Sequence, residues 1–461
     1  MKDFFINISK KKRGGALNFS ELLRYSLCAL IFGGGTFFLF YLKGFFFVHP
    51  IKTVREMFWR GDKSGISPLR ALSASLSGTL GVGNIVGVAV AMISGGAGAV
   101  FWIWVSAFVS MVLKYCEITL GVKYRKKRDA GLSGGPMYYM EKGLGGRFGR
   151  ACGTLFAAAA VVSSFSVGNI VQVYAASDAA NIIFGVNEFV FGVAFALVTS
   201  LVIFGGFERI SRVTSVVLPV MSAVYLLLCV VVVAENAHLL HAFFCDIFSQ
   251  AFESDSACGG VLGFVFSKGF SEGVCKGTFS HESGSGTAPM AHANAQTDAP
   301  ARQGLLGLFE VFADTIIMCT LSAFVILAAW RNGVKNENGM GLVLDAFAAE
   351  MGEWICFVIG ACILLFAFST LICWAYYGKC CLAYITRSKT AKIVYILIYL
   401  AFVAFGTLLS QETVWLCADI AIALMSALNL PAMFIMRKEI KRETEVIFSV
   451  CQGPCRSKRR C

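Results

Sequence analysis

The chain has 461 residues, of which 57% are apolar and only 15% are charged, and its mean hydropathy is +0.70. This composition is typical of a protein that crosses a membrane several times. The net charge of +12 would suit a nucleic-acid-binding protein, but the Lys and Arg residues lie in short loops and at the two ends of the chain. We therefore exclude nucleic acid as a partner and expect a lipid bilayer around the chain.

Eleven segments are apolar over a length that can cross a bilayer, for which an α-helix needs about 20 residues. In chain order they lie at about 25–48, 71–93, 99–122, 154–176, 188–204, 213–234, 258–293, 304–329, 354–375, 393–409 and 414–436. We therefore expect an all-α polytopic membrane protein with about 11 transmembrane helices. The loop at 235–257 contains no Lys or Arg.

The basic residues set the expected orientation in the membrane. Most of them lie in residues 43–70, 123–150, 209–212 and 379–392 and in the tail after Met436. Because these stretches alternate as cytoplasmic loops must, we place them and the C-terminus in the cytoplasm of a multi-pass inner-membrane protein. An odd number of spans puts the N-terminus outside, in conflict with its own basic residues. The conflict would disappear if the first apolar segment lay along the membrane surface.

The segment 71–93 is interrupted by residues 78–84, with the sequence Gly-Thr-Leu-Gly-Val-Gly-Asn. Each Gly costs about 1 kcal/mol relative to Ala inside a helix, and unwound backbone within a bilayer must be buried in protein or line a cavity. The free N–H groups of such a break suit a carboxylate, and its free carbonyls suit an ammonium group or Na⁺. Close packing of helices through small residues would explain Gly83 and Gly87 equally well.

A second irregular segment contains residues 277–286, with the sequence Gly-Thr-Phe-Ser-His-Glu-Ser-Gly-Ser-Gly. With the N-terminal helix set aside, ten segments remain, and the interrupted ones are the first and the sixth. Interruptions at matching positions of two five-helix halves are typical of inverted-repeat transporters with a site at the bilayer midplane. The expected divisions are a basic segment at 1–24, a helix and loop at 25–67, five-helix repeats at 68–234 and 258–436, and a basic cytoplasmic tail at 437–461.

Three motifs of the chain are distinctive: Gly95–Val105 (GGAGAVFWIWV), Gly81–Ala89 (GVGNIVGVA) and Gly134–Tyr139 (GGPMYY). They resemble motifs of the alanine/glycine:cation symporters, and the resemblance covers the chain from about Gly65 to Pro431. It implies a leucine-transporter-like fold and Na⁺-coupled uptake of alanine, glycine or D-alanine by alternating access. It implies Na⁺ as the coupling ion and no organic cofactor.

The resemblance also implies roles for residues near the first break. The amides of Gly81 and Gly83 would hold a substrate carboxylate, and the Thr79 carbonyl would face the ammonium group or an ion. The expected Na⁺ ligands are Ser77, Leu80, Asn84, Ser369 and Thr370. Judged from the residues alone, the two adjacent hydroxyls could instead bond to the preceding turn of their own helix.

Four further residues are expected around the substrate: Gln172, Phe279, Ser280 and Trp374. Gln172 is a polar amide in an apolar span and needs a partner, for which a helix–helix hydrogen bond is the alternative to a substrate contact. The bulky Phe279 and Trp374 would restrict the pocket to small side chains. His281, in the second break, titrates near neutral pH and keeps proton coupling as the alternative mechanism.

Chemistry other than transport has little support in the sequence. No Ser/His/Asp set, metal-ligand cluster or phosphate loop stands out, so we do not expect an enzyme. A channel or a receptor-like membrane protein is a weaker alternative, because only two short polar breaks interrupt the apolar spans. Lys114 and Glu117 should pair with each other at their i, i+3 spacing, whereas Glu310, Asp314 and Asp419 have no evident partner. We expect a monomer whose partners are a small amino acid, Na⁺ and lipid.

Overall fold

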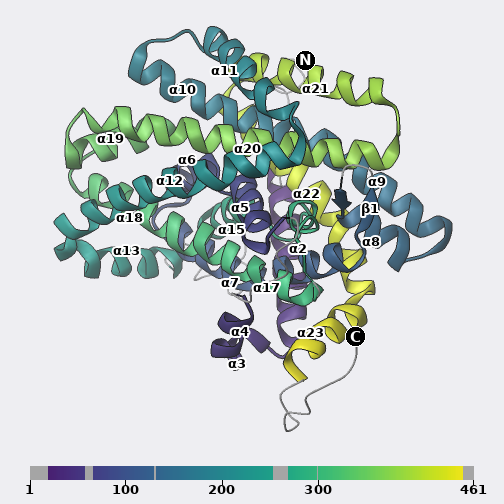
Figure 1. The fold of residues 1–461 in the computed structure, drawn as a ribbon. Helices are drawn as coiled ribbons and strands as arrows, with labels where there is room; N and C mark the ends of the chain where they lie inside the picture. The colour runs from purple at the N-terminus through teal and green to yellow at the C-terminus, as the bar shows by residue number, and fades with distance from the viewer. Residues whose placement is uncertain (1–18, 58–65, 129–130, 253–267, 298, 450–461) are drawn as a thin grey trace.

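The computed structural model describes residues 19–57, 66–128, 131–252, 268–297 and 299–449, and almost every element in this part of the chain is a helix (Figure 1). The all-α prediction is therefore confirmed. One departure is an antiparallel hairpin in a predicted cytoplasmic loop, formed by β1 (Lys126–Arg128) and β2 (Gly131–Ser133).

Eight helices of the described residues are long and apolar enough to cross a membrane, or nine if one bent pair counts as a span. The single helices are α2 (Phe19–Tyr41), α7 (Gly98–Lys123), α12 (Gly206–Glu235), α20 (Ile355–Ile385) and α22 (Gln411–Ile435), and α21 (Lys389–Phe405) reaches the required length with the 3₁₀ turn η6 (Gly406–Leu408). The composite ones are α9 (Gly146–Ser164) with η2 (Ser166–Ile170) and α10 (Val171–Phe184), and α17 (Pro300–Val311) with η5 (Phe312–Cys319) and α18 (Thr320–Arg331). The remaining predicted spans correspond to the shorter α11 (Glu188–Ile203) and to interrupted helices. Length and apolarity alone thus support eight or nine of the predicted eleven.

The first interrupted helix is as the sequence predicts. Helix α5 (Pro68–Thr79) is followed by one 3₁₀ turn, η1 (Val82–Asn84), and then by α6 (Val86–Gly95). The two halves are bent by 61° relative to each other. The predicted interruption is therefore confirmed, although Gly78 and Thr79 still belong to α5, and Leu80 and Gly81 lie outside both half-helices.

The second interruption lies further along the chain than predicted. Helix α15 (Lys268–His281) includes residues 277–281, which the sequence analysis places in the break, and α16 (Ala288–His292) follows. The residues between them leave the helix because Gly284 and Gly286 have φ values of +85° and +84°, a left-handed conformation that suits glycine. Both interrupted helices lie in the centre of the molecule, where α7 packs against α15 and α20 packs against α5 (Figure 1).

Two composite helices contain π-helical turns that the sequence analysis does not foresee. One is η2, between α9 and α10, and the other is η5, between α17 and α18. A π turn inserts an extra residue into the helical ladder and is frequent at functional sites. Here η2 directly precedes Gln172, and η5 contains Asp314. Both turns therefore aim polar side chains toward the interrupted helices.

Short helices occupy stretches expected to be loops or tails. They are α4 (Pro50–Met57), α8 (Pro136–Gly143), α13 (Leu240–Phe252), α19 (Gly339–Met351) and α23 (Arg437–Ser449), whereas the short α3 (Phe45–Val48) lies within the predicted first span. The predicted first span at 25–48 is wrong at both ends, because α2 begins at Phe19 and a left-handed turn at Lys43 and Gly44 separates it from α3. α3, α4 and α23 lie together at one end of the molecule (Figure 1), where the Phe45 and Phe448 ring centroids are 5.0 Å apart.

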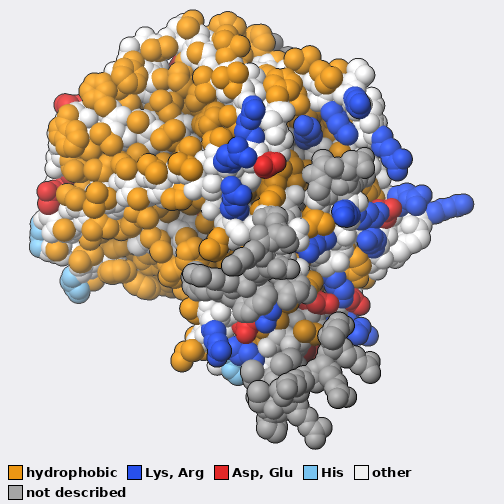
Figure 2. Space-filling model, viewed as in Figure 1, with side chains coloured by type: hydrophobic (Ala, Val, Ile, Leu, Met, Phe, Trp, Pro, Cys, Tyr) orange, Lys and Arg blue, Asp and Glu red, His pale blue; other side chains and the backbone are white. Residues whose placement is uncertain are grey.

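The surface is apolar over the long helices. Large side chains that are more than half exposed include Leu197, Leu201, Val216, Leu227 and Leu397. Figure 2 shows hydrophobic side chains covering most of one broad region, with Lys and Arg gathered to the side of it. A soluble protein rarely exposes so much contiguous apolar surface, so this region is the one that faces lipid.

Candidate functional site

The backbone of the first break is hydrogen-bonded to the side chain of Gln172, a residue of α10. The Val82 amide donates to Gln172 Oε1 at 3.2 Å, while Gln172 Nε2 donates to the Val167 carbonyl at 3.1 Å across the π turn η2. The Gly81 amide, expected to hold a substrate carboxylate, donates to the Thr79 carbonyl at 2.8 Å in this conformation. Gln172 therefore makes the helix–helix hydrogen bond that the sequence suggests, and it makes this bond to the backbone of the break, next to the predicted substrate region.

Two of the glycines in the break, Gly81 and Gly83, have neighbours too close for any side chain. A Cβ atom at Gly81 would lie 2.7 Å from Gln172 Oε1 and 2.8 Å from Thr370 Oγ1. A Cβ atom at Gly83 would lie 2.7 Å from two ring carbons of Phe279. Real Cβ contacts are not this short, because packed atoms stand about 3.5–4.0 Å apart. Gln172, Thr370 and Phe279 thus converge on the backbone of the break from three different helices.

Only one of the two adjacent hydroxyls on α20 faces the broken helix. Thr370 Oγ1 donates to the Ser77 carbonyl at 3.0 Å, whereas Ser369 Oγ donates to the Phe366 carbonyl of its own helix at 2.9 Å. Ser77 Oγ is buried without a hydrogen-bond partner among the described residues. One turn further along α20, Cys373 Sγ donates to the Ala74 carbonyl at 3.2 Å. Two contacts therefore fasten α20 to α5, and Ser369 takes part in neither.

Asn84 belongs to a different cluster from Ser77 and Thr370. Its Nδ2 donates to Ser280 Oγ at 2.7 Å and to Asp314 Oδ1 at 2.8 Å. Ser280 Oγ and Thr315 Oγ1 both donate to Asp314 Oδ2, at 2.7 and 2.8 Å. Asn84 Oδ1 is buried with no hydrogen-bond partner within the described ranges. The predicted ligands are therefore divided between two groups of oxygens, and Ser280 lies in the second.

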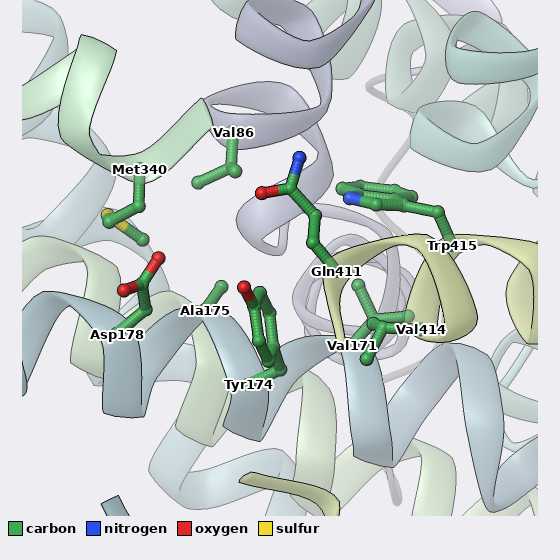
Figure 3. A pocket seen from close by; sticks show the side chains of 9 residues that line it. All are labelled: Val86, Val171, Tyr174, Ala175, Asp178, Met340, Gln411, Val414 and Trp415. Carbon is green, nitrogen blue, oxygen red and sulfur yellow. The ribbon is translucent and has the colours of Figure 1, made fainter. Parts of the chain in front are cut away.

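The two predicted aromatic walls have different partners. Phe279, in the last turn of α15, covers Gly83 and meets Trp415 edge to face, with ring centroids 5.0 Å apart. Trp374 is 1% exposed, and its Nε1 donates to Glu282 Oε1 at 3.1 Å. Figure 3 shows Trp415 beside a small pocket between α6, α10, α19 and α22. Its lining residues are Val86, Val171, Tyr174, Ala175, Asp178, Met340, Gln411, Val414 and Trp415.

The buried charges pair across helices, and the predicted Lys114–Glu117 pair is wrong. Lys114 Nζ lies 3.1 Å from Glu310 Oε1 and donates to the His281 carbonyl at 2.7 Å. Glu310 Oε1 also accepts hydrogen bonds from Ser75 Oγ at 3.0 Å and from Thr79 Oγ1 at 3.5 Å. The Thr79 hydroxyl thus faces a carboxylate at the base of the break.

Glu117 instead caps the second break. Its Oε2 accepts hydrogen bonds from the amides of Gly284 and Gly286, at 3.2 and 3.0 Å. His281 is 0% exposed, and its Nδ1 accepts a hydrogen bond from the Ser283 amide at 3.1 Å. His281 is therefore enclosed by the protein in this conformation and does not face an open vestibule.

All three carboxylates expected to lack partners have them: Glu310, which pairs with Lys114, Asp314 and Asp419. Asp314 is held by Asn84, Ser280 and Thr315. Asp419 Oδ2 lies 3.2 Å from Arg24 Nε, and its Oδ1 lies 3.5 Å from Lys276 Nζ. Sequence spacing does not reveal such partners, because they come from helices far apart in the chain.

The sequence of the chain matches a known family of membrane proteins. Residues 16–450 match the model of the Sodium:alanine symporter family. The chain belongs to this family. The match is wider than the range from Gly65 to Pro431 that the motifs cover. The chain is therefore a membrane symporter for an amino acid, with Na⁺ as the coupling ion, and not an enzyme.

Similar proteins include two named symporters. The sodium/alanine symporter AgcS of Methanococcus maripaludis is 35% identical over 431 residues, which are 91% of this chain and 93% of that protein. The probable sodium/glutamine symporter GlnT of Bacillus subtilis is 35% identical over 418 residues, which are 90% of this chain and 86% of that protein. Relatives of equal identity thus carry different substrates in their names.

Solved structures share the fold at low sequence identity. MhsT in complex with L-phenylalanine has a TM-score of 0.58 and 13% identity, covering 84% of this chain and 99% of that one. A Na⁺-coupled sialic acid symporter in a substrate-bound outward-open state has a TM-score of 0.57 and 15% identity, covering 90% and 87%. The expected leucine-transporter-like fold is therefore confirmed.

Proposed function

We propose that the protein takes up a small neutral amino acid, alanine or glycine, together with Na⁺, by alternating access around the first break. The observation that carries the proposal is the convergence of Gln172, Thr370 and Phe279 on Gly81 and Gly83. Unwound backbone beside an amide side chain and a hydroxyl offers groups for both ends of a zwitterion. Phe279, which covers Gly83, and Trp374 are the proposed walls that favour alanine and glycine over larger amino acids.

The ion is proposed to bind where α20 meets α5. The Thr370 hydroxyl and the Ser77 carbonyl are 3.0 Å apart, and oxygen ligands of this kind suit a hard cation. With an ion present, the Thr370 oxygen would act as a ligand and its proton would turn away from Ser77. The Leu80 carbonyl, which lies between the two half-helices, is a proposed third ligand. Ser369 is not proposed as a ligand, because its hydroxyl bonds within its own helix.

The cluster around Asp314 is the second proposed place for a coupling cation. Asp314 is 0% exposed and is held only by neutral groups among the hydrogen bonds of the described residues. A buried carboxylate is costly unless a cation or a proton compensates it, and the unpaired Asn84 Oδ1 would serve as a further ligand. The same observation supports proton coupling as the second candidate, because a proton on Asp314 would also remove the charge.

The proposed topology follows the basic residues. The C-terminus and the loops rich in Lys and Arg lie in the cytoplasm, and the protein acts as a monomer in the inner membrane. The ten helices from α5 to α22, excluding the short ones between them, form two five-helix repeats, with α5–α6 and α15–α16 at matching positions.

The test is uptake of radiolabelled alanine into liposomes that contain the purified protein. Inward gradients of Na⁺, Li⁺, K⁺ and protons are compared in turn, with unlabelled glycine, glutamine and leucine as competitors. We expect accumulation with the Na⁺ gradient, competition by glycine, and no competition by leucine. Uptake that follows the pH gradient and ignores Na⁺ would make proton coupling the better account. Strong competition by glutamine with none by glycine would overturn the proposed substrate.

A further inference from the structure

The Trp374 side chain is held at one position beside the first repeat. It packs across Gly168, in the π turn η2, where a Cβ atom would lie only 1.8 Å from Trp374 Cγ. On another side its ring meets that of Tyr377, with centroids 5.8 Å apart and planes at 63°. These contacts restrain the indole by packing, and its only polar atom is the ring N–H. The hydrogen bond of that N–H therefore adds a directional restraint to the packing.

Glu282, the hydrogen-bond partner of this N–H, has an unusual backbone conformation. Its φ is +50°, and Lys43 is the only other residue besides glycine with a positive φ in the described part of the chain. Such a conformation is strained and persists only where the surroundings fix it. Here the Glu282 amide donates to the Thr278 carbonyl at 2.8 Å, and Ser285 Oγ donates to the Glu282 carbonyl at 2.6 Å. The hydrogen bonds of the second break thus fix the backbone conformation of Glu282 and the direction of its side chain.

Both side-chain oxygens of Glu282 are occupied by neutral donors. Oε1 accepts the Trp374 Nε1–H at 3.1 Å, and Oε2 accepts the Thr287 hydroxyl at 2.7 Å. Glu282 is 3% exposed, and no basic side chain lies within ion-pair distance of it in the described ranges, since Lys114 pairs with Glu310. Carboxylates accept hydrogen bonds more strongly than neutral oxygens do. The arrangement is a buried acceptor directed at one indole.

We propose that Glu282 is a positioning residue that fixes the Trp374 indole and thereby sets the largest side chain that the carrier accepts. The inference rests on the proposed function, because it takes Trp374 as a wall of the substrate pocket. With the N–H held, the ring cannot rotate away, and amino acids with side chains longer than a methyl group meet it. Without the acceptor, the buried N–H has no hydrogen-bond partner, which costs free energy. The ring then rotates to orientations in which the N–H finds a different acceptor.

The experiment measures a ratio of affinities. Competition with labelled alanine uptake at saturating Na⁺ gives the inhibition constants of unlabelled alanine and of 2-aminobutyrate, which has one methylene more. We expect Glu282→Ala to lower the ratio of the 2-aminobutyrate constant to the alanine constant by about fivefold or more, within the range that one methylene can command. Glu282→Gln keeps an acceptor oxygen and should leave the ratio within about twofold of the parent.

The matched control removes the donor instead of the acceptor. Trp374→Phe retains an aromatic ring without the N–H, and it should relax the ratio by itself. In a double-mutant cycle, Glu282→Ala should then add nothing to Trp374→Phe, because both changes break one interaction. An equal effect of Glu282→Ala in both backgrounds would overturn the inference, as would an unchanged ratio in Glu282→Ala.

Two further results keep the inference separate from folding and from the proposed substrate. If Glu282→Ala does not fold, Trp374→Phe alone decides, and a parental ratio in that variant overturns the inference. If the parent carries glutamine and not alanine, the proposed substrate is wrong. The same variants then compare glutamine with a homologue one methylene longer, and the ratio tests Glu282 as before.

Discussion

Thr370 and Ser369 are neighbours in sequence, but their hydroxyls have different hydrogen-bond partners. A helix turns by about 100° per residue, so adjacent side chains point in different directions. Thr370 faces the Ser77 carbonyl, while Ser369 bonds back to Phe366. Both are 1% exposed or less, so burial does not distinguish them. The distinction makes Ser369 a natural control for Thr370.

Thr370→Ala should raise the Na⁺ concentration needed for half-maximal alanine uptake by about tenfold, which corresponds to the loss of about 1.4 kcal/mol from one ligand. Alanine affinity at saturating Na⁺ should change much less. Uptake titrated with Na⁺ at fixed pH gives both quantities. Ser369→Ala should behave like the parent, and an equal shift in the two variants would show that Thr370 has no special role.

Gly83→Leu should abolish alanine binding while the protein still inserts into the membrane. A side chain at 83 must displace Phe279, since even its Cβ would lie 2.7 Å from that ring. Equilibrium binding of labelled alanine to the purified protein measures the effect. Gly33→Leu, at a position with nothing within 4 Å of a Cβ atom, is the control and should bind normally. Alanine affinity within about twofold of the parent in Gly83→Leu would contradict the proposed site.

At the scale of elements, α7 holds the second break at both of its edges. Lys114 meets the carbonyl end of α15 at His281, and Glu117 meets the amides of Gly284 and Gly286. Charges of these signs suit the two kinds of unpaired backbone group at a helix interruption. Because both residues come from one face of α7, the break and this helix should move together.

Glu117→Ala should lower the thermal stability of the protein in detergent. It leaves two buried amides without an acceptor, and each unsatisfied group costs about 1–3 kcal/mol. Glu117→Gln keeps a side-chain oxygen and should lose much less. Melting temperatures from a fluorescence-based thermal scan of the purified variants provide the measurement. Equal melting temperatures for the parent and Glu117→Ala would show that the two amides find another partner.

The sequence reveals the first break but only part of its surroundings. Three glycines and Asn84 within an apolar span are a local signal, and the break falls where they predict it. The partner of Asn84 is not local, because Asp314 follows 230 residues later. The i, i+3 spacing of Lys114 and Glu117 is misleading for the same reason: partners from other helices bind each of them more favourably.

The second break and the π turns show a further limit of prediction from sequence. Gly277 lies inside α15, where it allows close packing: a Cβ atom there would lie 2.3 Å from Ser106 Oγ. Gly284 and Gly286 instead adopt left-handed conformations. Residue type alone does not distinguish these two uses of glycine. Likewise, the register change in η2 that brings Gln172 to the first break has no sequence signature of its own.

At the scale of the whole molecule, α2 is bound to α15 and α22 by charged groups. Arg24 pairs with Glu272 of α15 and Asp419 of α22, and Lys276 shares Asp419. At the opposite end of α2, the short helices α3 and α4 meet α23, and Lys52 Nζ donates to the Phe448 carbonyl at 3.0 Å. The N-terminal and C-terminal regions thus join the core from outside it.

Tags at the two ends of the chain should report opposite sides of the membrane. A green fluorescent protein fused after the C-terminus should fluoresce, because it folds in the cytoplasm. The same reporter does not become fluorescent when it is exported unfolded. An epitope placed before Phe19 should bind antibody on spheroplasts without permeabilisation. A control with the epitope after the C-terminus should require permeabilisation. An N-terminal epitope that is also hidden would mean that α2 does not span the bilayer.

The contact between Cys373 and Ala74 gives the protein a chemical reporter of its own motion. The thiol is 2% exposed while its Sγ bonds to the Ala74 carbonyl, so a maleimide cannot reach it in this state. If α5 swings away from α20 when the carrier opens inward, the thiol becomes reactive. Peptide mapping by mass spectrometry would then show that Na⁺ slows the alkylation of Cys373, because Na⁺ favours the closed contact at Thr370. The natural sequence would thus already contain a thiol whose alkylation rate reports alternating access.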